Sequence, residues 1–243
     1  MYFWKIWREN RIRLFALLIL GLCVGWFAWS QVSLILVVAG FETGQTLPAE
    51  IASRVWSRGM EAVMFVGGVS LYFMGLVVGA SGLGEEMERG TAVFLLTRPR
   101  SRGYFVWSFW LASGVELLAF TAITMLAGYA TLFYLTRRAG PWNFLLLGPI
   151  LMITGLLAVG LAHLLTTASR RTKNAVAAGV SFSLTYLILA FVLGGFHILN
   201  LPSPRAMYSL DWSAALAASM LGWLAVSVAF VAASHLIVKR MEV

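Results

Sequence analysis

Glu116 is the one carboxylate that lies deep within a long apolar stretch, and it could act as a polar station for a passing molecule. A helix that starts near Tyr104 places Glu116 about 18 Å along its axis, at ~1.5 Å per residue. A charge at that depth in a bilayer costs at least ~2.5 kcal/mol, so we expect the carboxyl group to be protonated, paired or exposed to water. Two interpretations stay open: a group on a substrate path or between two copies of the chain, and a hydrogen bond between helices that serves packing alone.

Ser81 is the second candidate for chemistry, because Gly79-Ala80-Ser81-Gly82 matches the G-x-S-G motif of rhomboid-type intramembrane proteases. A serine nucleophile needs a histidine base within hydrogen-bond reach and donors that stabilise an oxyanion. The histidine and asparagine motifs that accompany the serine in those proteases are absent from this sequence. Small residues at a helix end are the favoured interpretation, and an intramembrane serine protease is the weaker alternative.

The three histidines do not form a metal site by their spacing. His163 and His235 lie toward one end of their apolar stretches and His197 toward the other, with no H-x-x-x-H or E-x-x-H pair. The single cysteine, Cys23, adds no ligand set. The sequence also lacks the G-x-x-x-x-G-K-[ST] motif that holds ATP phosphates. We therefore expect no metal and no cofactor bound by this chain itself.

The composition places these residues in a membrane protein. Hydrophobic residues make up 60% of the 243 residues and charged residues 12%, whereas soluble domains average about 25% charged residues. Six stretches each exceed the ~20 residues that cross a bilayer as a helix. They cover residues 14–40, 62–84, 103–136, 142–169, 174–201 and 212–238. The sequence predicts one all-α integral membrane domain over residues 1–243, with six transmembrane helices.

The basic residues predict the orientation of these helices. With the N-terminus in the cytoplasm, thirteen of the eighteen Lys and Arg residues lie on the cytoplasmic side. The positive-inside rule therefore favours a multi-pass protein with both termini in the cytoplasm. The net charge of +8 lies at the membrane borders, where it meets lipid headgroups. We expect membrane lipids as partners and no nucleic acid.

Two segments outside the six stretches are predicted to form surface helices. Residues 1–13 carry Trp and Phe on one face and Lys and Arg elsewhere, which is typical of a helix lying in the headgroup plane. Within residues 41–61, Pro48 suits a first helical position and Glu50 lies four residues before Arg54. This second segment predicts an external half-helix at the membrane surface.

Small residues at a spacing of four predict close contacts between membrane helices. Gly21 and Gly25 form one such pair, and Gly75 and Gly79 form another.

Residues 85–102 form a dense charged segment between two apolar stretches. Gly90-Thr91 offers a helix start, because the threonine hydroxyl can cap the first turn, and Pro99 offers a stop. A helix of about two turns is too short to be stable alone in water. Phe94, Leu95 and Leu96 are therefore expected to dock into a groove of a soluble partner.

This segment resembles the loop after the second helix of ABC-2 type transporter permeases. In that family the loop carries a coupling helix, which seats in the ATP-binding subunit. The resemblance implies a fold of six transmembrane helices with an N-terminal interfacial helix and a short cytoplasmic coupling helix. The coupling residues it implies are Glu85, Glu86, Glu88, Arg89, Gly90, Thr91, Phe94, Leu95, Leu96, Thr97, Arg98, Pro99 and Arg102.

The resemblance also implies partners and a location. The chain is expected to be the permease subunit of an exporter in the cytoplasmic (inner) membrane of a prokaryote. A second permease chain, identical or related, and separate ATP-binding cassette subunits would complete the transporter, and ATP would be hydrolysed in those subunits. The alternative is a structural membrane subunit that moves no substrate. The substrate cannot be predicted from these residues.

Overall fold

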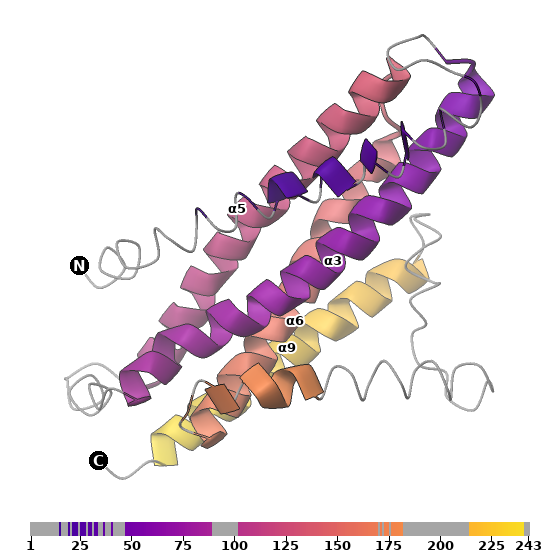
Figure 1. Ribbon diagram of the computed structural model, residues 1–243. Helices are drawn as coiled ribbons and strands as arrows, with labels where there is room; N and C mark the ends of the chain where they lie inside the picture. Colours follow the sequence, from indigo (N-terminus) through magenta and orange to yellow (C-terminus); the bar gives the residue numbers. More distant parts are fainter. Residues whose placement is uncertain are drawn as a thin grey trace. The chain divides into compact units, whose positions relative to one another are not determined.

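The structure is a computed structural model that describes residues 47–88, 102–169 and 214–240, together with separate positions within 15–40 and 171–181. The elements over these residues are all helices (Figure 1). They are α3 (Ala49–Glu88), α5 (Arg102–Thr136), the short 3-10 helix η1 (Trp142–Leu146), α6 (Leu147–Ser169) and α9 (Ala214–Arg240).

Four segments of the described chain are long and apolar enough to cross a membrane as helices. They are Ala49–Ser81, Tyr104–Thr136, Phe144–Ser169 and Met220–Arg240. The protein is therefore an all-helical membrane protein over its described part. The predicted stretches 62–84, 103–136, 142–169 and 212–238 fall on α3, α5, η1 with α6, and α9. Residues 1–13 and most of the stretches 14–40 and 174–201 lie outside the described residues, so the count of six helices stays a prediction.

The separate surface helix predicted within residues 41–61 is wrong over the described residues, because residues 49–61 form the first turns of α3. This helix is continuous over 40 residues, about 60 Å at ~1.5 Å per residue. Its length exceeds the ~30 Å hydrocarbon core of a bilayer. The sequence has no proline between Pro48 and Pro99. The helix that begins at Ala49 can therefore continue without a break into the apolar stretch 62–84.

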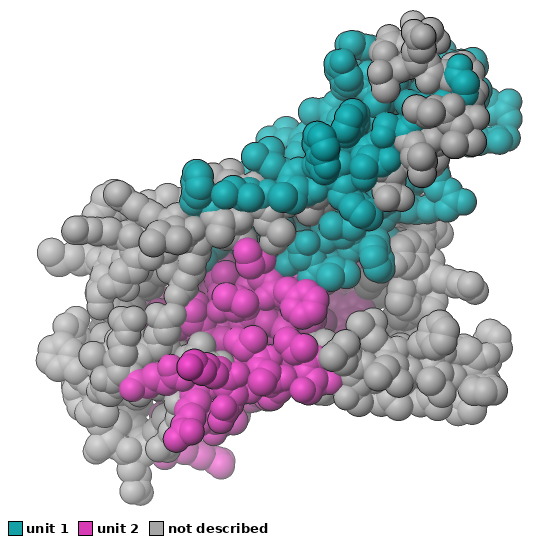
Figure 2. All heavy atoms as spheres, in the orientation of Figure 1, with its two compact units in different colours: residues 1–71, 116–152 teal, residues 72–115, 153–243 magenta. Residues whose placement is uncertain are grey.

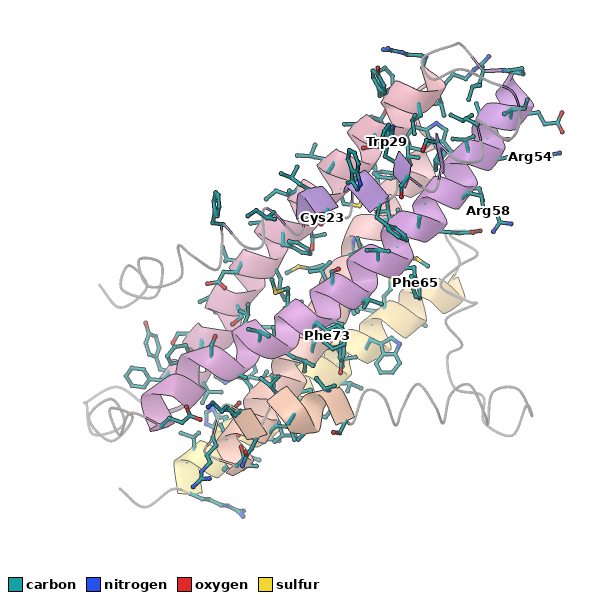
Figure 3. All side chains as sticks on the ribbon, in the orientation of Figure 1. Cys23, Trp29, Arg54, Arg58, Phe65 and Phe73 are labelled. Atoms are coloured by element: carbon teal, nitrogen blue, oxygen red, sulfur yellow. The ribbon has the colours of Figure 1, made fainter. Side chains whose placement is uncertain are left out.

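Charged side chains mark the Ala49 end of α3. Arg54 pairs with Glu50 and Arg58 pairs with Glu61, each at 2.9 Å, and all four side chains are exposed. Figure 3 shows Arg54 and Arg58 pointing away from the helix. This end of α3 is therefore suited to water or to lipid headgroups rather than to the hydrocarbon core.

The helices divide into two compact units, which are described separately (Figure 2). Unit 1 comprises residues 1–71 and 116–152, and unit 2 comprises residues 72–115 and 153–243. Each of α3, α5 and α6 contributes residues to both units, whereas α9 belongs to unit 2 alone.

In unit 1, α3 and α5 pack in an antiparallel register with small residues at the contacts. The contacts join Gly59 to Leu132, Val63 to Gly128 and Gly67 to Thr124. Each step of four residues forward on α3 matches a step of four back on α5, so the i±4 rows of both helices meet. The glycines let the two backbones approach closely. In lipid no hydrophobic effect drives helices together, so such close van der Waals packing holds them.

The predicted close approach at Gly21 and Gly25 is confirmed in unit 1. A Cβ added at Gly21 would lie 3.0 Å from Cγ2 of Ile123, and one added at Gly25 would lie 2.9 Å from Cβ of Ala127. The two glycines therefore pack against consecutive turns of α5.

The second predicted pair, Gly75 and Gly79, is confirmed in unit 2, where it packs against α6. A Cβ at Gly75 would lie 2.5 Å from the carbonyl oxygen of Gly155, and one at Gly79 would lie 2.8 Å from Cα of Val159. Four residues forward on α3 match four residues forward on α6, so these helices run parallel. The seam continues into a buried cluster of Leu76, Ala80, Ala158, Leu161 and Ala162.

In unit 2, α9 lies beside α6 and runs in the same direction (Figure 1). The hydroxyl of Ser227 donates to the carbonyl of Leu156 at 2.7 Å. A Cβ at Gly160 would lie 2.8 Å from the carbonyl oxygen of Ser227. A glycine on α6 and a serine on α9 therefore allow a polar bond between closely packed helices.

Candidate functional site

The predicted coupling segment begins and ends on regular helices. Glu88 is the last residue of α3 and is exposed, and Arg102 is the first residue of α5. Glu85 and Glu86 lie in the final turns of α3. The other predicted coupling residues lie outside the described residues: Arg89, Gly90, Thr91, Phe94, Leu95, Leu96, Thr97, Arg98 and Pro99. Their helix and its docking stay predictions.

Glu116 is buried on α5, with 4% of its surface exposed. It belongs to unit 1 and lies one turn before Phe120 and two turns before Thr124, which are both fully buried. An ionised carboxylate in such surroundings is expensive unless it is paired or hydrogen-bonded. The sequence had singled out this residue by its depth in an apolar stretch, and the structure places it on the inward side of its helix.

In the part of α5 that belongs to unit 1, the buried face carries polar side chains among apolar ones, whereas the large exposed side chains are apolar or aromatic. The buried polar residues are Glu116, Thr121, Thr124 and Thr136. The large exposed residues are Leu118, Leu126, Tyr129, Phe133 and Tyr134. A surface helix of a water-soluble protein exposes polar side chains instead. The apolar exposed face of α5 is therefore suited to lipid, and the buried polar groups lie inside the protein.

Two of the buried threonine hydroxyls on this face form no hydrogen bond within their own helix. Thr136 donates to the carbonyl of Leu132 at 2.8 Å, which is the usual local bond of a helical threonine. The hydroxyls of Thr121 and Thr124 have no hydrogen-bond partner in the described part of the chain. The buried face of α5 thus offers two hydroxyl groups in addition to the carboxyl group of Glu116.

A cluster of hydrogen bonds lies at the Thr136 end of α5 in unit 1. The indole N–H of Trp56 donates to the hydroxyl of Thr136 at 3.2 Å. Nε of Arg138 donates to the carbonyl of Leu47 at 2.9 Å. Both bonds join the start of α3 to the end of α5, so they fix the two helix ends together.

Aromatic rings pack around the same indole. Trp56 meets Phe144 of η1 edge to face at 5.8 Å and Tyr129 of α5 at 5.4 Å between ring centroids. A Cβ at Gly140 would lie 2.5 Å from the Trp56 ring. In the sequence, Trp56 lies within the segment 41–61 that predicts a surface helix. Its partners are many residues distant in sequence, and no local pattern links them.

Ser81 forms the local hydrogen bond of a helical serine, and the buried His163 does not pair with it. Its hydroxyl is buried and donates to the carbonyl of Val78 at 2.9 Å. Neither imidazole nitrogen of His163 has a hydrogen-bond partner among the described residues, so His163 is not a base for this serine. Within those residues, no three His, Cys, Asp or Glu side chains gather as metal ligands would.

The fold and this pattern of burial define a multi-pass membrane protein that buries several polar side chains within an apolar core. The model of the ABC-2 family transporter proteins matches residues 30–212, which is most of the chain. The chain belongs to this family, as the resemblance of its charged segment predicted. No curated protein matches it. Members of the family form the transmembrane part of ABC transporters, associate with ATP-binding subunits and are not catalytic themselves.

Proposed function

We propose that this chain is the permease subunit of an ATP-driven exporter. It crosses the membrane six times, and two such chains, identical or related, pair with two separate ATP-binding subunits that hold and hydrolyse ATP. Membership of the ABC-2 family supports this assignment, because the family matches most of the chain. The absence of a phosphate-binding P-loop from the sequence fits a division of labour between subunits.

In the proposed topology both termini lie in the cytoplasm of a prokaryotic cell, and the protein lies in the inner membrane. The excess of Lys and Arg on that side supports this orientation. The Glu88 end of α3 and the Arg102 end of α5 then face the cytoplasm. The ion-paired Ala49 end of α3 and the Trp56 cluster then face the outside.

The observation that carries the coupling proposal is the continuity of the two helices that flank residues 89–101. Regular helix continues to Glu88 on one side and begins at Arg102 on the other. A short helix held between two long ones passes its displacement on to both of them, as rigid elements do in switching proteins. ATP binding closes the partner subunits, displaces this segment and thereby reorients α3 and α5.

The buried polar face of α5 is the proposed contact with the substrate. Glu116, Thr121 and Thr124 would supply hydrogen bonds to a cargo that moves along this helix. Carboxyl groups inside membrane spans typically line transport paths or pair between helices. The apolar character of the remaining surface is compatible with a lipid-like or hydrophobic cargo.

The double variant Leu95→Arg and Leu96→Arg tests the coupling proposal. Two charges in an apolar docking helix should abolish binding of the ATP-binding subunit, because each would be buried without a partner. The measurement is a pull-down of the tagged chain in mild detergent, followed by mass spectrometry and an ATPase assay. We expect the wild type to retain a soluble protein with P-loop motifs, and the double variant to lose it while still inserting into the membrane.

A control variant adds a positive charge elsewhere. Ala139 is exposed in the connection between α5 and η1, on the opposite side of the membrane in the proposed topology. Ala139→Arg should leave the ATP-binding subunit attached. Unchanged assembly in the Leu95/Leu96 variant would contradict the docking proposal. A wild-type preparation that retains no ATPase would favour the structural subunit instead.

A further inference from the structure

His163 is a buried imidazole in unit 2 that the proposed function does not use. It lies on α6 and is 1% exposed. Neither Nδ1 nor Nε2 has a hydrogen-bond partner among the described residues. A neutral imidazole carries one donor and one acceptor, and buried polar atoms almost always have partners, often ordered water. The two nitrogens therefore require a partner that can both donate and accept.

Thr166, three residues further along α6, has a hydroxyl in the same situation. Its Oγ1 is buried and has no hydrogen-bond partner in the described part of the chain. The adjacent Thr167 shows the usual alternative, because its hydroxyl donates to the carbonyl of His163 at 3.0 Å. Thr166 does not form this local bond, so its hydroxyl remains available to another partner.

The packing of α6 places His163 between α3 and α9. Val159 faces Gly79 of α3, and Gly160 faces Ser227 of α9. His163 follows Val159 by four residues and Gly160 by three, so it lies one turn further along both rows. His163 is therefore at the seam where the three helices of unit 2 meet.

A third polar side chain lies at the same level on α9. Ser227 bonds to the carbonyl of Leu156, and the two helices run in the same direction (Figure 1). One heptad further along each helix, Ser234 is level with His163. Ser234 is fully buried, and its hydroxyl donates to the carbonyl of Phe230 at 3.0 Å, which leaves its oxygen able to accept.

We propose that His163, Thr166 and Ser234 form a hydrated polar site in the seam between α3, α6 and α9. Water is the ligand whose hydrogen-bonding chemistry matches, because it donates to the acceptor nitrogen of the imidazole and accepts from the N–H and from hydroxyl groups. Three polar side chains supply the two to four partners that a buried water needs. The site lies toward the C-terminal ends of the three helices, which face the cytoplasm in the proposed topology.

Thiol accessibility tests this site directly. Replacing the single cysteine by Cys23→Ser gives a background without thiols. In that background, the His163→Cys and Thr166→Cys variants place a thiol at the site. The Val159→Cys variant places one at a fully buried apolar position one turn away on the same helix. Each purified variant is treated with a small, water-soluble methanethiosulfonate reagent, and the rate of modification is followed by mass spectrometry.

We expect both variants at the site to react at least about tenfold faster than Val159→Cys, because the reactive thiolate forms only where water reaches it. Equal, slow rates at all three positions would overturn the proposal. An equally fast rate at Val159→Cys would also overturn it, since the whole seam would then be open. Thr166→Cys keeps the test decisive if His163→Cys does not fold. The assay needs no ATP-binding subunit, so its outcome is independent of the coupling test.

Discussion

The hydroxyl of Ser227 on α9 and the carbonyl of Leu156 on α6 are joined by a 2.7 Å hydrogen bond. This bond is between helices, whereas the hydroxyl of Ser234 on α9 bonds to its own helix at Phe230. Both serines are fully buried. A comparison of the two serines therefore separates the stability that a direct bond between helices contributes from the stability that a bond within one helix contributes.

Ser227→Ala should destabilise the protein by about 0.5–1.5 kcal/mol, the net value of one hydrogen bond, and membrane examples lie near the lower end of that range. Ser234→Ala should cost less, because its direct bond lies within one helix and the proposed water keeps His163 and Thr166 as partners. The check is the thermal unfolding midpoint of each variant in the same detergent. A larger loss for Ser234→Ala would contradict the assignment.

Gly79→Ala should destabilise unit 2 by roughly 1–3 kcal/mol, because the new methyl group meets the backbone of Val159 and cannot be accommodated by a rotamer change. Gly222→Ala on α9 is the control, since a Cβ there meets no described atom within 4 Å. That variant should be neutral or stabilising by up to ~1 kcal/mol, because alanine favours a helix over glycine. Equal effects of the two substitutions would show that the α3–α6 contact is looser than described.

Thr136→Val should cost about 1–3 kcal/mol, because it leaves the buried indole N–H of Trp56 without its partner. Thr121→Val is the same change on the same helix, at a buried hydroxyl without a partner among the described residues. It should be neutral or stabilising. Combining Trp56→Phe with Thr136→Val should cost less than the sum of the single changes, and additive effects in this cycle would rule out the bond.

Arg137 directly follows α5 and has φ of 51°, the left-handed conformation that glycine usually supplies just after a helix end. Arg137→Gly should therefore be tolerated within about 0.5 kcal/mol, although it loses the stacking of the guanidinium on Tyr134. Arg137→Val should destabilise by roughly 1–2 kcal/mol, since a β-branched residue is disfavoured there. The measurement is the thermal unfolding midpoint of each variant. An Arg137→Val variant as stable as the wild type would contradict the left-handed conformation of Arg137.

Long apolar stretches predicted the helices well, because the span of a bilayer fixes a minimum length and α5 and α6 must meet it. The close contact at Gly79 could also be predicted from the sequence, because small residues four positions apart lie on one face of a helix. The start of α3 could not, because a surface helix and the first turns of a membrane helix have the same local pattern of charged and apolar residues. Only the continuity of the backbone separates the two.

The residues of the candidate functional site could be predicted only where a polar residue stands within an apolar stretch of sequence. Glu116 stood out because a carboxylate is rare within an apolar stretch. The bond of Trp56 to Thr136 joins residues 80 positions apart, so no local spacing could reveal it. His163 looked like one of three unremarkable histidines, and its significance depends on the rows of α6 that face α3 and α9.

The polar side chains on the buried face of α5 have a consequence for biogenesis. A ribosome adds about 5–20 residues per second, so α5 enters the bilayer a few seconds before α6 has been synthesised. During that interval the translocon must release a span that carries Glu116, at a cost of a few kcal/mol. By then α3 has been synthesised, and its small residues Gly59 and Gly67 match α5. Early pairing of these two helices would shelter the polar face of α5 from lipid, and the order of synthesis thereby becomes part of the folding pathway.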